Sequence, residues 1–296
     1  MMDNKRLRTP LGVALLVAGI AIVCTQSVKA RLQQAQTEKP KVSITVKDGY
    51  RYILSNGIPN HPTGKFPNRW CPNTIEAQQY SYRVPVSPKE SAENRHYRGF
   101  LFGVAENGIP FDPGTAEIWN NNSKWHYEAL GGYILTHESG LGVDKSNAHV
   151  QPNGAYHYHG LPFELLKKRD YKNKMAFVGY AADGYPIYGS YGYTDAKDPN
   201  SGMKELASSY RLKEGERPTG PTGIYDGSFA QDYEYVKGTG DLDEFNGRTG
   251  VTPEYPNGTY YYVLTAQFPY TPRTFKATPD ASFRKMMGPP PGEGRP

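Results

Sequence analysis

Three of the seven histidines in this chain lie within eleven residues, between His149 and His159. Two of them, His157 and His159, are two positions apart. Because successive side chains of a β-strand point to opposite faces, these two imidazoles share one face if the segment is extended. Neutral imidazole is a common protein ligand for zinc and for copper. The pair therefore predicts two nitrogen ligands that stand side by side.

The turn before this pair decides where His149 lies. A three-residue loop at 152–154, closed as a type I turn with a glycine bulge, would place His149 opposite His157. A two-residue Asn-Gly loop would place it opposite Tyr158, on the other face. Pro152 suits the first position of the longer loop. We therefore expect three imidazoles on one face, which leaves an open coordination position on a bound metal.

A second copy of the hairpin sequence supports a chemical role for these histidines. Residues 255–263 repeat residues 151–159, including the Pro-Asn-Gly turn, but the second copy has no histidine. Tyr261 and Val263 occupy the positions equivalent to the two histidines, so this type of hairpin does not need histidine to fold. The alternative is that the imidazoles only form hydrogen bonds with the many tyrosine hydroxyls.

Other residues offer further metal ligands, although each alone is more typical of a surface or packing position. They are His126, Glu128, His137, Glu138 and Asp144. The expected metal is copper or zinc, and imidazole ligands do not choose between the two.

Acidic residues raise a second possibility, a hydrolase. Asp183 follows an apolar run and precedes Gly184, so it is either a catalytic carboxylate at a strand end or a turn residue, and the glycine favours the turn. A hydrolase would need Asp183 within hydrogen-bond reach of a histidine. Asp241, Asp243 and Glu244 lack the spacing of an EF-hand loop and are more typical of a polar turn. The chain has no nucleophile elbow, phosphate-binding glycine loop or zincin motif.

Aromatic residues raise a third possibility, a module that binds a glycan or peptide on a stacking platform. The chain has 24 tyrosines, and Trp119 and Trp125 lie close together in sequence. Exposed coplanar rings beside a groove would support this function, whereas a closed aromatic core would not.

The elements that must position these residues are mostly strands. Abundant tyrosine, glycine and proline favour strands separated by tight turns. Residues 42–46 and 50–54 predict a hairpin, residues 175–181 and 259–265 predict buried strands, and residues 162–170 predict a short helix. The expected fold is mainly β, with antiparallel, sandwich-like sheets, hairpins and one or two short helices.

The N-terminus is typical of an export signal. Three basic residues precede an apolar run at 11–24, which is shorter than the about 20 residues that span a bilayer. Small residues at Val28 and Ala30 predict a signal peptide over residues 1–30, and hence a secreted or periplasmic protein. The alternative is an uncleaved N-terminal membrane anchor.

The mature chain is expected to consist of a polar flexible segment at 31–41, one β domain at 42–285 and a disordered Pro/Gly tail at 286–296. Loss of four basic groups and one acidic group with the signal lowers the formal charge from +5 to +2. Such a small excess charge argues against nucleic acid as a partner. No membrane partner is expected after cleavage, and a small molecule or glycan stays possible. Cys71 would be the only cysteine left, so no internal disulfide can form.

The sequence resembles the YHYH family, which is named for the tetrapeptide at 156–159. The likeness extends through residues 147–154, 181–188 and 243–248, and it continues at 103–112 and 268–273. It therefore covers nearly the whole mature chain. The resemblance implies membership of the family but brings no established activity. The residues themselves predict an exported metal-binding protein that uses His149, His157 and His159, with an undetermined catalytic role.

Overall fold

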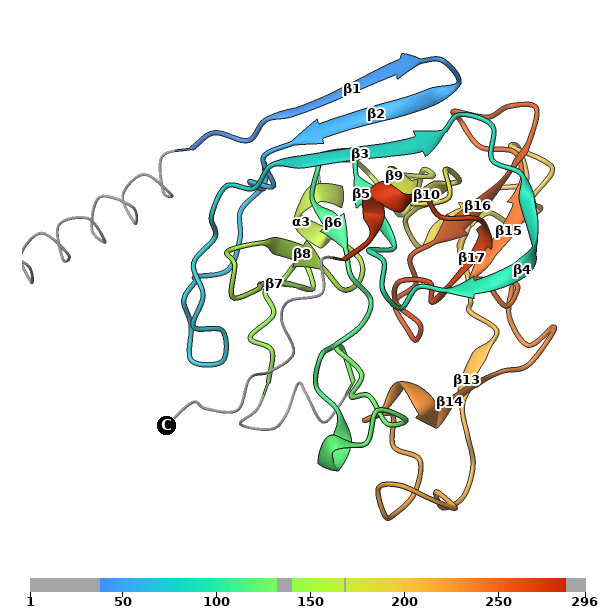
Figure 1. Cartoon of the computed structure of the whole chain (residues 1–296). Helices are drawn as coiled ribbons and strands as arrows, with labels where there is room; N and C mark the ends of the chain where they lie inside the picture. Colours follow the sequence, from blue (N-terminus) through green and yellow to red (C-terminus); the bar gives the residue numbers. More distant parts are fainter. Residues whose placement is uncertain (1–37, 132–139, 168, 286–296) are drawn as a thin grey trace, which may run out of the picture. The chain divides into compact units, whose positions relative to one another are not determined.

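Short strands joined by tight turns make up most of the molecule (Figure 1). The computed structural model describes residues 38–131, 140–167 and 169–285, and about 31% of the structure is strand and 6% is helix. Tyrosine, valine and isoleucine favour strands because aromatic and branched side chains pack well on a pleated surface. The prediction of a mainly β fold with antiparallel sheets and few short helices is confirmed.

The first sheet has three antiparallel strands, β1 (Val42–Lys47), β2 (Tyr50–Ser55) and β3 (Tyr80–Pro85). Asp48 and Gly49 join β1 to β2, and both have positive φ angles of 52° and 78°. Two such residues form the mirror-image turn that matches the twist of a hairpin. The predicted N-terminal hairpin is therefore confirmed.

The largest sheet has eight strands in the order β15-β16-β10-β9-β5-β6-β8-β7. Its strands are β5 (Gly103–Ala105), β6 (Pro110–Phe111), β7 (Ala148–Val150), β8 (Tyr156–Tyr158), β9 (Phe177–Ala181), β10 (Pro186–Tyr188), β15 (Gly247–Gly250) and β16 (Thr259–Val263). Most neighbours are antiparallel, but β10 pairs with β16 and β6 pairs with β8 in parallel. The two predicted buried strands correspond to β9 and β16, and the parallel pairs were not expected. The strand that carries His149, β7, lies at one edge of the sheet.

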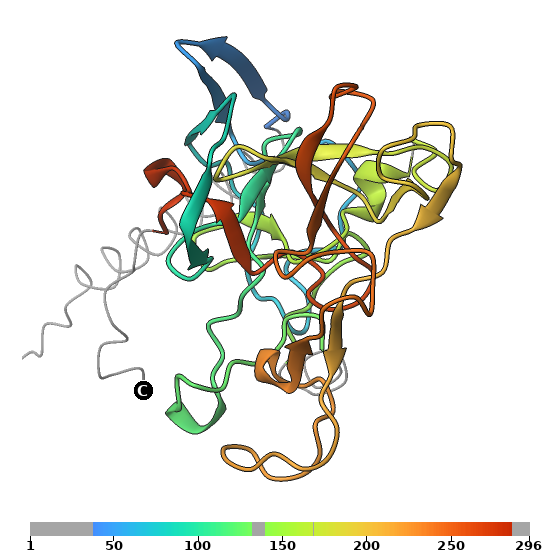
Figure 2. The ribbon, with the colours of Figure 1, turned by 90° about the vertical axis from the view of Figure 1, so that its right-hand side faces the viewer.

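Three two-stranded sheets complete the fold. They are β4 (Glu90–His96) with β17 (Thr274–Ala277), β11 (Tyr191–Tyr193) with β12 (Met203–Glu205), and β13 (Tyr210–Leu212) with β14 (Tyr233–Tyr235). Figure 2 shows β17 beside β4, although about 180 residues separate them in sequence. This pairing brings the C-terminal part of the chain to its first third.

The helices in the described part of the chain are short. The α-helix α3 (Phe163–Leu166) has only four residues, so the helix predicted at 162–170 forms within that range but is shorter. Three 3-10 turns are η1 (Trp119–Asn121), η2 (Ala230–Asp232) and η3 (Ala281–Phe283). Pro162 precedes α3, and the buried Leu166 attaches the helix to the core.

Tyrosine rings fill much of the core. The largest side chains that are fully buried are Tyr156, Tyr158, Tyr188, Tyr261 and Tyr262. Each aromatic ring buries about 150–250 Å² of surface, so these five contribute strongly to stability. Packing therefore explains part of the abundance of tyrosine.

The described residues from Lys39 to Lys285 belong to one compact unit. No helix in the described part of the chain is long and apolar enough to cross a membrane. The predicted signal peptide at 1–30, most of the segment at 31–41 and the predicted tail at 286–296 lie outside the described residues. They stay predictions.

Candidate metal centre

The β7–β8 hairpin has the register that the longer loop requires. His149 pairs with His157, and Val150 pairs with Tyr156. The Gln151 amide donates to the carbonyl of Ala155 at 3.0 Å, which leaves residues 152–154 as the loop. Gly154 has a φ of 82°, a left-handed conformation that glycine adopts without steric cost. The prediction that the three-residue loop brings His149 opposite His157 is confirmed.

The three imidazoles form one cluster. The ring centroid of His149 lies 4.6 Å from that of His157 and 5.0 Å from that of His159, and the centroids of His157 and His159 are 4.7 Å apart. One nitrogen from each ring lies within 4.8 Å of the other two, so the group could hold a metal ion. The Nε2 atoms of His157 and His159 are 3.1 Å apart. Two nitrogens on one tetrahedral zinc, at about 2.0–2.1 Å each, stand about 3.3 Å from each other. This pair therefore already has nearly the spacing of two ligands of one ion.

Backbone carbonyls set the orientation of two rings. The Nδ1 of His149 is 2.9 Å from the carbonyl of Leu141, and the Nδ1 of His157 is 3.3 Å from that of Ala155. A carbonyl only accepts, so each Nδ1 carries the proton and each Nε2 keeps its lone pair. Outer-sphere hydrogen bonds of this kind orient metal-binding imidazoles.

The third ring, His159, has a different environment. Because Nε2 of His157 is an acceptor, His159 donates its own Nε2 proton across the 3.1 Å contact. The Nδ1 of His159 is then a buried acceptor, and it has no hydrogen-bond partner among the described residues. A buried polar atom without a partner costs about 1–3 kcal/mol. Hydrogen bonding within the described part of the protein therefore does not explain why a histidine occupies this buried position.

Burial lowers the pKa of all three imidazoles. It lowers the pKa of His157 to about 3, with a further contribution from His149, and it lowers the pKa of His159 well below the usual value. The pKa of half-buried His149 is also lowered, again mainly by burial. All three rings are therefore neutral at pH 7, the form that binds a metal ion.

The tyrosines of the same strand point to the other face, as expected. The hydroxyl of Tyr156 donates to Asp144 at 2.7 Å, and the hydroxyl of Tyr158 contacts Nε2 of His61 at 2.5 Å and Nδ2 of Asn107 at 3.0 Å. These contacts hold β8 from behind. Asp144, a weaker candidate ligand, therefore lies with the tyrosines and not with the histidine cluster.

The other weaker candidates also have different partners. His126 Nε2 lies 2.9 Å from the carbonyl of Ser123. Glu128 is buried, and its two carboxylate oxygens accept hydrogen bonds of 2.8 and 2.6 Å from Nη2 of Arg273. His137 and Glu138 lie outside the described residues.

Asp183 occupies a buried turn. Its carboxylate accepts from the Tyr262 hydroxyl at 2.6 Å and from the amides of Ala277 and Tyr185. Burial raises its pKa to about 6. Gly184, with a φ of 96°, completes the turn. No histidine is among the hydrogen-bond partners of Asp183 in the described part of the chain, and such a partner is what a hydrolase would need.

The acidic group near residue 243 also has structural contacts. Asp243 accepts from the amides of Phe245 and Gly247 and from the hydroxyl of Tyr260, each at 3.0 Å. Asp241 pairs with Lys204 at 2.5 Å. These bonds are those of an ordered polar turn.

The two tryptophans do not form an open platform together. Trp125 is buried and packs edge-on against Phe229 at 5.6 Å, and Trp119 is half-buried. Tyr156, Tyr158, Tyr188, Tyr261 and Tyr262 are fully buried in the core.

One charged pair whose charges act on His157 was not predicted from the sequence. Asp112 is buried, and its carboxylate lies 2.6 Å from Nζ of Lys285. Its charge raises the pKa of His157, whereas the charge of Lys285 lowers it. The only feature of the sequence that pointed to Asp112 is its place at the end of the segment at 103–112 that resembles the family. Lys285 lies 173 residues away in sequence, so no local pattern could have joined the two.

Comparison with known proteins gives one match. The family model described as YHYH protein matches residues 81–277, which include the histidine hairpin and the Asp183 turn. No curated protein matches the chain, and no solved structure matches it.

Proposed function

The chain belongs to the YHYH family, and we propose that it binds one transition-metal ion, zinc or copper, through His149, His157 and His159. The observation that carries the proposal is the cluster of three neutral imidazoles on one face of the β7–β8 hairpin. Two of the rings are almost fully buried, and their Nε2 atoms already face each other at 3.1 Å.

The chemistry of the ligands supports this function. Imidazole binds both zinc and copper, and three imidazoles leave a position on the ion for water or a small ligand. Such an ion would polarise an oxygen bound to it. The carbonyls of Leu141 and Ala155 would keep two rings in the binding tautomer, and His159 would have to move its proton from Nε2 to Nδ1.

We also propose that the site works outside the cytoplasm. The support is the basic and apolar pattern of residues 1–30, which is typical of a secretory signal. Mass spectrometry of the N-terminus of the protein isolated from its host would test this. A mature chain that begins at Arg31 is expected, and an intact Met1 would contradict it.

Metal binding is tested by elemental analysis and by titration of the purified protein with Zn²⁺ and Cu²⁺. We expect near-stoichiometric binding in the parent and none in the double variant His157→Ala/His159→Ala. His149 lies at the sheet edge, so His149→Ala disturbs the fold least. This variant loses a direct ligand. Its metal affinity should therefore fall by more than the roughly 10–100-fold that is lost when only an outer-sphere hydrogen-bond partner of a ligand is removed.

The matched control is His61→Ala. This variant removes an imidazole that contacts Tyr158 on the opposite face of β8. This variant should bind metal like the parent. The proposal fails if the folded parent binds neither ion, or if a folded double variant, checked by circular dichroism, binds as well as the parent.

A further inference from the structure

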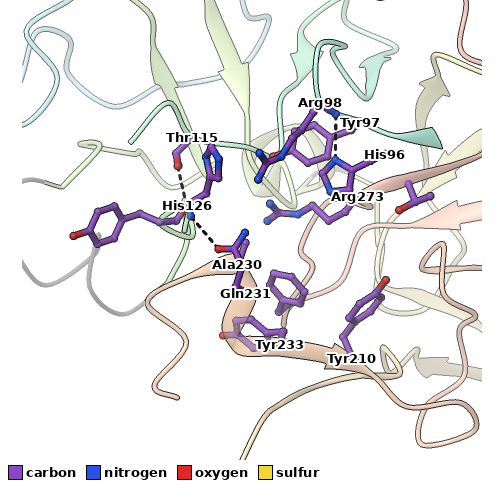
Figure 3. A pocket seen from close by; sticks show the side chains of 13 residues that line it. His96, Tyr97, Arg98, Thr115, His126, Tyr210, Ala230, Gln231, Tyr233 and Arg273 are labelled. Atoms are coloured by element: carbon purple, nitrogen blue, oxygen red, sulfur yellow. Dashed lines mark hydrogen bonds between the residues drawn. The ribbon is translucent and has the colours of Figure 1, made fainter. Parts of the chain in front are cut away.

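A second site lies near the end of β4, separate from the three imidazoles. It is a cavity of about 170 Å³ lined by side chains that include His96, Tyr97, Arg98, His126, Tyr233 and Arg273. Figure 3 shows Arg273 reaching from one side toward His126, with Arg98 and His96 above it. The residues come from four separate parts of the chain, so only the folded protein has this cavity.

The charges around the cavity are mostly positive. Its lining includes two arginines and no aspartate or glutamate. Among the described residues, the exposed Arg98 guanidinium has no hydrogen-bond or ion-pair partner. Glu128 does not line the cavity, and its carboxylate is paired with Arg273. Arg98, Arg273 and Glu128 together therefore carry one net positive charge.

Arg273 has hydrogen-bond capacity that the protein does not use. Its side chain is nine-tenths buried, and its contacts with Glu128 and the carbonyl of Pro269 all use Nη2. The buried Nε has no partner among the described residues. A guanidinium has five donors in a fixed fork, which matches the oxygens of a carboxylate.

The two histidines add neutral polar groups. Burial lowers the pKa of His96 to about 4, helped by Arg98 and Arg273, and burial also lowers the pKa of His126. The Nδ1 of His96 accepts from the amide of Arg98 at 3.3 Å, so Nε2 carries the proton and can donate. Neither ring adds charge at pH 7.

Aromatic rings form the other wall. Tyr233 stacks on Phe268 with centroids 3.9 Å apart, and Tyr210 packs edge-on against Phe268 at 5.6 Å. A cavity of about 150 Å³ is large enough to hold benzene. The size and the wall therefore suit a ligand with a single ring.

We propose that this cavity binds a small organic monocarboxylate with one ring, whose carboxylate lies between Arg98 and Arg273 and whose ring packs against Tyr233 and Phe268. The single net positive charge matches one carboxylate and is too small for a doubly charged phosphate. This site is distinct from the metal site, and it can exist whether or not metal binds.

The test is calorimetric titration of the full protein with benzoate, benzyl alcohol and inorganic phosphate. Benzoate should bind with a Kd of about 1 mM or tighter. Benzyl alcohol has the same ring without the charge, and it should bind at least about tenfold more weakly, because a charge-assisted hydrogen bond is lost. Arg98→Gln removes an exposed side chain, so it should keep the fold and weaken benzoate about tenfold.

The matched control is Arg211→Gln, which removes an exposed arginine that pairs with Glu234 outside the cavity. It should leave benzoate binding unchanged. The proposal is overturned if benzoate does not bind, if benzyl alcohol binds as tightly as benzoate, if phosphate binds more tightly than benzoate, or if Arg98→Gln binds benzoate like the control. The three imidazoles do not line this cavity. All titrations are made at the same metal content, so failure here is distinct from failure of the metal site.

Discussion

His157 and His159 are polar side chains in a place where the fold would normally put apolar ones. Both are only 2% exposed, and at the equivalent positions of the second Pro-Asn-Gly segment the chain has Tyr261 and Val263, which are fully buried. The second segment ends a longer loop, because Gly250 pairs with Thr259 and residues 251–258 join β15 to β16. Its strand nevertheless shows that an aromatic or apolar side chain fills the aligned, buried position without an unpaired imidazole nitrogen. The histidines therefore cost stability that a bound ion would offset, since a ligand that binds only the folded state stabilises it.

Asp183 shows how a buried carboxylate links stability to pH. Its pKa is raised from 3.8 to about 6, mainly by burial, so the folded state binds the proton more tightly than the unfolded chain. This contribution to stability is fully present below about pH 4 and is lost as pH rises through about 6. At about 1.4 kcal/mol per unit, the loss is about 3 kcal/mol.

Urea unfolding of the parent and Asp183→Asn between pH 4 and pH 7 measures this contribution. Asparagine does not titrate, so the free energy of unfolding of the parent, relative to the variant, should fall by about 2.4 kcal/mol over this range, which covers most of the full contribution. The variant itself should be less stable than the parent at pH 4, because its amide cannot accept from all three donors. A difference between parent and variant that stays constant with pH would contradict the raised pKa.

At the scale of the element, the β7–β8 loop determines the metal site. The register of the hairpin could be predicted because Pro-Asn-Gly favours one loop length, and loop length fixes which side chains share a face. A loop that is shorter by one residue would turn His149 away from the other two imidazoles. The histidine cluster is therefore a property of the turn as much as of the histidines.

Two matched glycines test this role of the loop. Gly154 and Gly258 end the two Pro-Asn-Gly segments with φ angles of 82° and 90°. A Cβ at Gly154 would lie 2.5 Å from Cβ of Glu76, whereas the nearest atom to a Cβ at Gly258 is a backbone oxygen at 3.7 Å. Gly258→Ala should therefore cost about 1 kcal/mol for backbone conformation alone, and Gly154→Ala about 2–4 kcal/mol.

Thermal or chemical unfolding gives the two stabilities, and titration with Zn²⁺ gives the affinities. Only Gly154→Ala should weaken metal binding, because only its loop carries the histidines. Equal losses of stability, or equal effects on metal affinity, would show that the clash with Glu76 and the shape of this loop do not matter.

At the scale of the whole molecule, the sequence predicted what depends on neighbours along the chain. The strands, the first hairpin and the histidine register follow from side-chain alternation and turn residues. The parallel pairing of β10 with β16, the ion pair of Glu128 with Arg273 and the contact of Asp112 with Lys285 join distant segments. Long-range pairs of this kind leave no pattern in one sequence. For the same reason the sequence could not separate His126, which lines the second cavity, from the ligands of the metal site.

The most direct test of the metal site is X-ray absorption spectroscopy of the protein loaded with one equivalent of Zn²⁺ or Cu²⁺. We expect three imidazole nitrogens at about 2.0–2.1 Å from zinc, with the outer scattering that imidazole rings produce, and no sulfur ligand. His61→Ala should give the same spectrum as the parent. A first shell made of oxygen alone, or one that contains the thiolate of Cys71, would contradict the assignment of His149, His157 and His159.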